Sequence, residues 1–130
     1  MTEPVIKSID HFVLYVADPE ATAQFYVQHL GVAVERFGPD RRIALRFGAH
    51  KINLHAAARP FQPHSDNPAA GAGDFCLLSG VPVDVLKQRL DAAGVVVESG
   101  PVPRTGAEGP ISSIYFRDPD GNLVEVSNRV

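Results

Sequence analysis

The sequence predicts an α+β fold built from two βαβββ modules. Extended and helical segments follow one another in the same order in both halves of the chain, and the pair Gly31-Val32 recurs 63 residues later as Gly94-Val95. A length of 130 residues suits one compact domain that buries roughly two thirds of its unfolded surface. We expect a single domain, 1–130, with modules at about 5–58 and 74–130 and a linker at about 59–73.

The first module begins with a strand at 6–16, in which successive side chains point to opposite faces. Asp18 can cap the helix that follows, Pro19 suits its first position, and Gly31 can end it. The glycine and proline residues that come later separate extended segments. We therefore expect three further strands, at 32–37, 42–47 and 51–56.

The second module repeats this order with a strand at 74–78 and a helix from about Val83 to Ala93. Its last two strands, at 114–116 and 123–127, are joined by the turn Asp118-Pro119-Asp120-Gly121, because proline presets φ and glycine accepts positive φ. Each half alone would leave one sheet face uncovered, so we expect a shared interior with the helices outside.

Two segments, 60–73 and 100–110, are too rich in glycine and proline to be assigned by propensity. Loops vary more readily than the scaffold beneath them, so we expect these segments to control specificity.

Composition excludes several classes of function. No apolar run approaches the roughly 18 residues of a membrane-spanning helix. A net charge of -3 without a basic stripe, and the absence of tryptophan, argue against a nucleic-acid partner. The start, MTEPVIKSID, lacks the features of a secretory signal, so a cytoplasmic protein is expected. Cys76 is the only cysteine and is expected to be a small buried hydrophobe.

Four possible metal ligands lie at positions that the repeat relates. The shift of 63 carries His11 onto Asp74, and a shift of 70 in the last strands carries His55 onto Glu125. Two imidazoles and a carboxylate suit Zn, Fe, Mn, Ni or Co. Taken singly, each residue also fits a core, strand-end or solvated position, and Asp74 fits a turn; the metal hypothesis depends on their joint placement.

Short motifs along the chain point to one known superfamily. They are IDHFVL at 9–14, FY at 25–26, LG at 30–31, KINLH at 51–55, RTGA at 104–107 and DPDGNLVE at 118–125. These motifs resemble the vicinal oxygen chelate superfamily, which includes glyoxalase, bleomycin-resistance proteins and extradiol dioxygenases. The resemblance covers essentially the whole chain, and small glyoxalase-domain proteins are especially similar. It implies paired βαβββ modules that form an eight-stranded, incompletely closed sheet around a metal, commonly in a homodimer.

By this resemblance His11 takes the ligand position of the first strand and Glu125 that of the last. We assign the fourth-strand position, often glutamate in glyoxalase I, to His55, while the fifth-strand position, usually histidine, is Asp74. The exchange keeps a possible set of two histidines and two carboxylates but relocates the acid or base.

The leading prediction is a divalent-metal-dependent lyase or isomerase of glyoxalase type. It would act on a small oxygenated substrate through a metal-chelated, enediolate-like intermediate. The metal would be held by His11, His55 and Glu125, and Glu125, or else Asp74, would move the proton. The expected substrate-binding residues are Lys51, Asn53, Arg104, Ser113 and Tyr115.

Two alternatives remain open at this stage. Two histidines and a carboxylate also suit an Fe(II)-dependent extradiol-type dioxygenase, although such enzymes are generally longer, duplicated chains. A metal-free antibiotic-binding protein would keep the fold but lose the ligands and gain an aromatic groove. The presence of His11 and Glu125 and the lack of tryptophan favour an enzyme over that binding protein.

Overall fold

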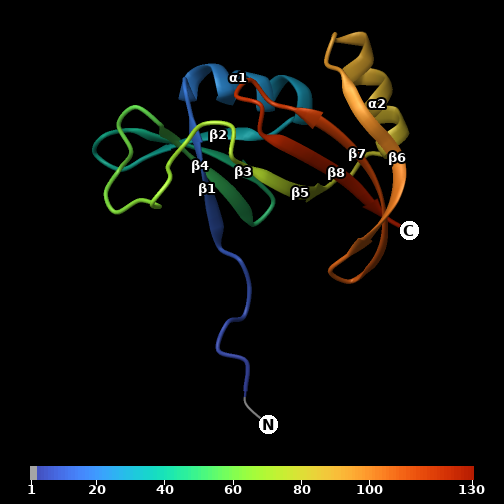
Figure 1. Ribbon diagram of the computed structural model, residues 1–130, viewed down its shortest axis with the longest axis horizontal. Helices are drawn as coiled ribbons and strands as arrows, with labels where there is room; N and C mark the ends of the chain where they lie inside the picture. Colours follow the sequence, from blue (N-terminus) through green and yellow to red (C-terminus); the bar gives the residue numbers. More distant parts are fainter. Residues whose placement is uncertain (1–2) are drawn as a thin grey trace. The chain divides into compact units, whose positions relative to one another are not determined.

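The computed structural model describes residues 3–130, which fall into two compact units, one up to His64 (unit 1) and one from Ser65 to Val130 (unit 2). In Figure 1 unit 1 runs from blue to green and unit 2 from yellow-green to red. Within residues 3–130 each unit holds one helix and a sheet of four strands. The structure thus confirms the α+β class and the two βαβββ modules. Neither helix has the length and apolar character needed to cross a bilayer.

Unit 1 is formed by β1 (His11–Val16), α1 (Pro19–Leu30), β2 (Ala33–Phe37), β3 (Arg42–Phe47) and β4 (His50–Ala56). The strand order is β1-β4-β3-β2, with β1 parallel to β4 and the other pairs antiparallel. The first strand begins at His11 and not at residue 6. The reason is that β4, its neighbour, begins at His50, so the chain before His11 has no strand to pair with.

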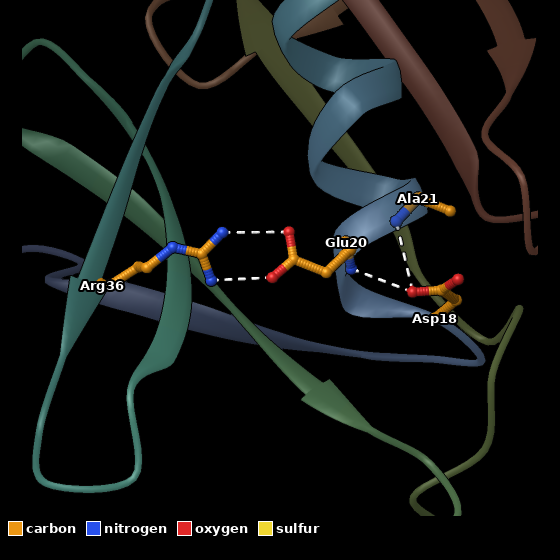
Figure 2. Close-up of polar contacts among 4 residues, drawn as sticks. All are labelled: Asp18, Glu20, Ala21 and Arg36. Atoms are coloured by element: carbon orange, nitrogen blue, oxygen red, sulfur yellow. Dashed lines mark hydrogen bonds and ion pairs between the residues drawn. The ribbon is translucent and has the colours of Figure 1, made fainter.

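The ends of α1 follow the signals in the sequence. Asp18 Oδ1 accepts hydrogen bonds from the backbone N–H groups of Glu20 (3.1 Å) and Ala21 (3.3 Å), as Figure 2 shows. Gly31 has φ of 68° and donates its N–H to the carbonyl of Val27 at 3.1 Å. These contacts satisfy helix-end groups that the helix itself leaves unpaired.

Unit 2 is formed by β5 (Asp74–Leu78), α2 (Val83–Ala92), β6 (Val97–Gly106), β7 (Gly109–Arg117) and β8 (Leu123–Arg129). The strand order is β5-β8-β7-β6, with β5 parallel to β8. The segment 100–110, expected to be a loop, is instead mostly strand: 100–106 make up most of β6, and Gly109 and Pro110 begin β7. The pairing of β6 with β7 is irregular near Gly100, where the φ of 106° favours glycine. Because of this irregularity, the segment does not have the sequence pattern of a regular strand.

Each sheet has one apolar face, which packs against the helix of its own unit, and one polar face. α1 packs on β2, β3 and β4, and α2 packs on β6, β7 and β8. The apolar faces include the buried residues Leu14, Val16, Ile43, Leu45, Ile52 and Leu54 in unit 1 and Ile114, Phe116, Val124 and Val126 in unit 2. Alternation places the other set on what we call the polar face: His11, Val13, Tyr15, Arg42, Ala44, Arg46, Lys51, Asn53 and His55 in unit 1, and Asp74, Cys76, Ser113, Tyr115, Glu125 and Ser127 in unit 2.

The turn before β8 is held by a buried carboxylate. Asp118, 5 % exposed, accepts hydrogen bonds from the backbone N–H groups of Asp120 and Asn122, both at 3.0 Å, and from the Asn122 side-chain amide at 2.8 Å. Asn122 Oδ1 accepts in turn from the N–H of Gly73 at 2.7 Å, next to the start of β5. The turn therefore holds β5 and β8 in register.

Replacing Asp118 with alanine should lower the free energy of unfolding by about 2–3 kcal/mol, because it leaves several buried donors without an acceptor. Urea unfolding followed by circular dichroism measures this change. Asp66→Ala, which removes an exposed aspartate of the same unit, is the matched control and should shift the midpoint little. Equal midpoints for the two variants would contradict the role given to the turn.

Candidate functional site

The polar face of unit 1 contains buried polar atoms that have no partner. His55 is 9 % exposed and Asn53 is 6 % exposed. Within residues 3–130, neither ring nitrogen of His55 takes part in a hydrogen bond, and Asn53 Oδ1 accepts none. Leaving such atoms unsatisfied costs about 1–3 kcal/mol each, so a protein retains them where a ligand or ion satisfies them. These two residues mark the candidate site.

His55 is held among aromatic rings as a neutral imidazole. Its ring lies edge-on to Tyr15, at a centroid distance of 5.8 Å, and to Phe61, at 6.0 Å. Burial lowers the pKa of His55 below its ordinary value, and the positive charge of Arg42 lowers it further. A neutral imidazole keeps a lone pair, which is the form that binds a metal ion.

His11 is oriented by its neighbour in the sequence. Its Nδ1 lies 2.8 Å from Asp10 Oδ1, and this hydrogen bond lowers the pKa of Asp10. With Nδ1–H donating to a carboxylate, Nε2 carries the lone pair of the neutral ring. A carboxylate behind the imidazole is the usual support of a metal-binding histidine.

The register separates the two histidines along the strands. His11 lies opposite Lys51 and His55 lies opposite Tyr15, an offset of four positions, or about 13 Å along parallel strands. Asn53 is midway between these two levels. Across residues 3–130, no three or more His, Cys, Asp or Glu side chains come together closely enough to hold a metal ion. Neither unit by itself assembles the ligand set predicted from the sequence.

In unit 2, Glu125 ends a chain of short hydrogen bonds. Ser113 Oγ donates to Glu125 Oε2 at 2.7 Å and lies 2.6 Å from Ser127 Oγ, which is 3.2 Å from Cys76 Sγ. Both serines are fully buried. Ser113, predicted to bind substrate, therefore uses its hydroxyl to orient the carboxylate.

The register corrects the relation between the two halves. Cys76, which the shift of 63 equates with Val13, lies opposite Glu125, and Val13 lies opposite Asn53. Asn53 is thus the counterpart of Glu125, and the shift of 70 that equated Glu125 with His55 is wrong by two residues. An error of two leaves side-chain alternation unchanged, so His55 still belongs to the polar face.

Cys76 is exposed and not buried as expected. Phe75 and Leu77, its neighbours in β5, point to the apolar face, so the residue between them points to the polar face. Asp74, at the start of the same strand, is also exposed.

Three predicted substrate-binding side chains already have contacts. Lys51 Nζ lies 4.0 Å from the centre of the Phe37 ring. Arg104 Nε donates to the Tyr115 hydroxyl at 2.9 Å, and its guanidinium lies 5.4 Å from the centre of the same ring. Because Arg104 and Tyr115 contact each other, a ligand that binds one of the two side chains would also contact the other.

Sequence reasoning missed a cavity of about 340 Å³ in unit 1, which His55 and Phe61 line together with several arginines. The arginines come from separate segments, so no local sequence motif predicts that they lie together. A wider depression of about 820 Å³ lies over α1 and β2 and contains none of the predicted site residues.

The thiol of Cys76 should titrate above its ordinary pKa of 9.0. Although the residue as a whole is exposed, partial burial of its sulfur atom and then the charge of Glu125 outweigh the hydrogen bond from Ser127. Glu125→Gln should lower this pKa but keep it raised, since burial remains. The pH dependence of alkylation by iodoacetamide measures both values. Glu108→Gln removes an exposed carboxylate and should change nothing; identical profiles for the two variants would show that Glu125 does not act on the thiol.

Comparisons with known proteins agree on one family. The family model described as "Glyoxalase/Bleomycin resistance protein/Dioxygenase superfamily" matches residues 8–126. The chain is 44% identical over 126 residues to the virulence protein STM3117 of Salmonella typhimurium, covering 97% of this chain and 87% of that protein. The crystal structure of STM3117 superposes with a TM-score of 0.93, covering 98% of this chain and 100% of that one.

Two further proteins are similar to the chain. The glyoxalase domain-containing protein RDO1 of Mycosarcoma maydis is 43% identical over 123 residues, covering 95% of this chain and 69% of that protein. The crystal structure of lactoylglutathione lyase from Agrobacterium tumefaciens is 26% identical, with a TM-score of 0.73 and 96% of each chain covered.

Proposed function

Because the chain belongs to the Glyoxalase/Bleomycin resistance protein/Dioxygenase superfamily, we propose that it is a divalent-metal-dependent lyase or isomerase that acts on a small oxygenated molecule. The observation that carries this proposal is the pair of buried, unpartnered polar side chains, His55 and Asn53. An imidazole nitrogen and an amide oxygen fit a divalent cation or a hydroxyl group of a substrate. The likeness to a lactoylglutathione lyase supports the reaction class.

The residues that would hold the metal are His11, His55 and Glu125. Their donor types suit a divalent cation: one histidine is neutral through burial, the other is oriented by Asp10, and the carboxylate is oriented by Ser113. The register keeps the two histidines four positions apart in unit 1, so both imidazoles would have to extend toward the level of Asn53 to reach one cation. The cation would supply Lewis-acid polarisation of adjacent substrate oxygens. Zn, Ni, Mn, Fe and Co all suit this donor set.

Within the proposal Glu125 carries the proton, and Ser113 keeps one of its carboxylate oxygens in a fixed direction. Asp74 is the second candidate for the base because it lies on the same face of the same sheet. Asn53 Oδ1 would accept a hydrogen bond from a hydroxyl group of the substrate. A homodimer forms part of the proposal, as the family resemblance implies.

Elemental analysis of untagged protein should find about one divalent metal per chain, and the protein should convert adducts of methylglyoxal with a thiol. Glu125→Gln should reduce turnover at least about 100-fold, because it removes the proton carrier. His11→Ala and His55→Ala should lower the metal content. His50→Ala, an exposed histidine of β4 that lies outside the polar face, is the control and should keep both metal and activity.

Two results would contradict the proposal. Oxygen uptake with catechols, in place of conversion of the thiol adducts, would indicate an Fe(II) dioxygenase. Tight binding of an aromatic compound by protein that holds no stoichiometric metal would indicate a binding protein without catalysis.

A further inference from the structure

The cavity of about 340 Å³ lies where β4 ends and α1 begins, and its walls carry an excess of positive charge. Four arginines line it, against two carboxylates, Glu20 and Asp40. The remaining lining side chains are largely apolar, while Arg41 and Arg59 are themselves exposed. The four arginines are Arg36, Arg41, Arg42 and Arg59.

Both carboxylates are already engaged by arginines. Glu20 and Arg36 form a bidentate ion pair with distances of 2.7 and 3.0 Å, which joins α1 to β2 in Figure 2. Asp40 Oδ1 lies 3.3 Å from Arg42 Nε. Asp18 occupies the first N–H groups of α1, so the helix end contributes little to binding an anion. Any anion that enters must be recognised by arginine side chains.

The guanidinium groups of Arg41 and Arg59 have no polar or aromatic partner among residues 3–130. Because the two carboxylates balance Arg36 and Arg42, the cavity keeps two uncompensated positive charges, those of Arg41 and Arg59. A guanidinium presents paired N–H donors that match the two oxygens of a carboxylate or phosphate group.

Two buried groups give independent evidence of a ligand. His55 lines this cavity with both ring nitrogens unpartnered. Arg42 Nε, although close to Asp40, is buried and has no acceptor in hydrogen-bond geometry. The Arg42 guanidinium lies over the rings of Phe61 (3.9 Å) and Phe37 (4.8 Å), which hold its plane in place.

We propose that this cavity binds the acidic group, a carboxylate or a phosphate, of a small molecule through Arg41, Arg42 and Arg59. The substrate of the proposed reaction would then be an anion whose acidic end lies near His55. This identification of the substrate rests on the proposed function. Anion binding itself rests only on the residues of unit 1 that line the cavity. Phe61, from the segment expected to control specificity, is 44% exposed and lines the cavity.

Inorganic phosphate and acetate, titrated separately into the full-length protein at constant ionic strength, test this proposal. NMR amide shifts should saturate and should concentrate around the cavity for at least one of the two anions. The double variant Arg41→Asn/Arg59→Gln should weaken binding at least about tenfold. Asparagine suits position 41 because Arg41 has φ of 57°, where asparagine is tolerated. Arg89→Gln, on the exposed side of α2, is the control and should bind like the parent.

Saturation by phosphate alone would assign a phosphate group, and saturation by acetate would assign a carboxylate; both support the proposal. Amide shifts that rise linearly with both anions, without saturation, would overturn the proposal. Anion binding that survives in the double variant would also overturn it, because an anion held by a metal would still bind to that variant. The metal content of the double variant, measured in parallel, should equal that of the parent. A chain without metal that still binds the anion would reject the proposed reaction and leave the anion site standing.

Discussion

The parallel pairing of β1 with β4 and of β5 with β8, with one face of each sheet buried against a helix, is the constraint on which the rest of the structure depends. Val16, Leu45 and Ile52 are fully buried, so a slip of one residue would move such side chains into water. The same register places His55 and Asn53 on the opposite face. The apolar core therefore determines which polar side chains can act together.

The elements could be predicted where their signals are local. Asp18 and Gly31 define the ends of α1 through contacts within a few residues, and the structure contains those contacts. The start of β1 and the extent of β6 could not be predicted, because both depend on a partner strand. Residues before His11 have no neighbour in β4, and residues around Gly100 are extended because β7 pairs with them.

The candidate site was predictable in part for the same reason. Alternation along β4 and β8 assigns His55 and Glu125 to the polar faces even though the repeat was misaligned by two residues. The role of Ser113 and the exposure of Cys76 follow from cross-strand neighbours, which the sequence does not identify. The arginine-lined cavity depends on tertiary proximity of separate segments, so no spacing rule could find it.

The central proposal is that one unpartnered ring nitrogen of His55 and the carboxylate of Glu125 would bind the same divalent cation. Anomalous diffraction from crystals grown with one equivalent of Zn²⁺ tests it most directly. We predict a single strong peak, about 2.0–2.2 Å from a ring nitrogen of His55 and from a carboxylate oxygen of Glu125. A peak found only at an exposed histidine such as His50, with His55 bonded to water alone, would contradict the proposal.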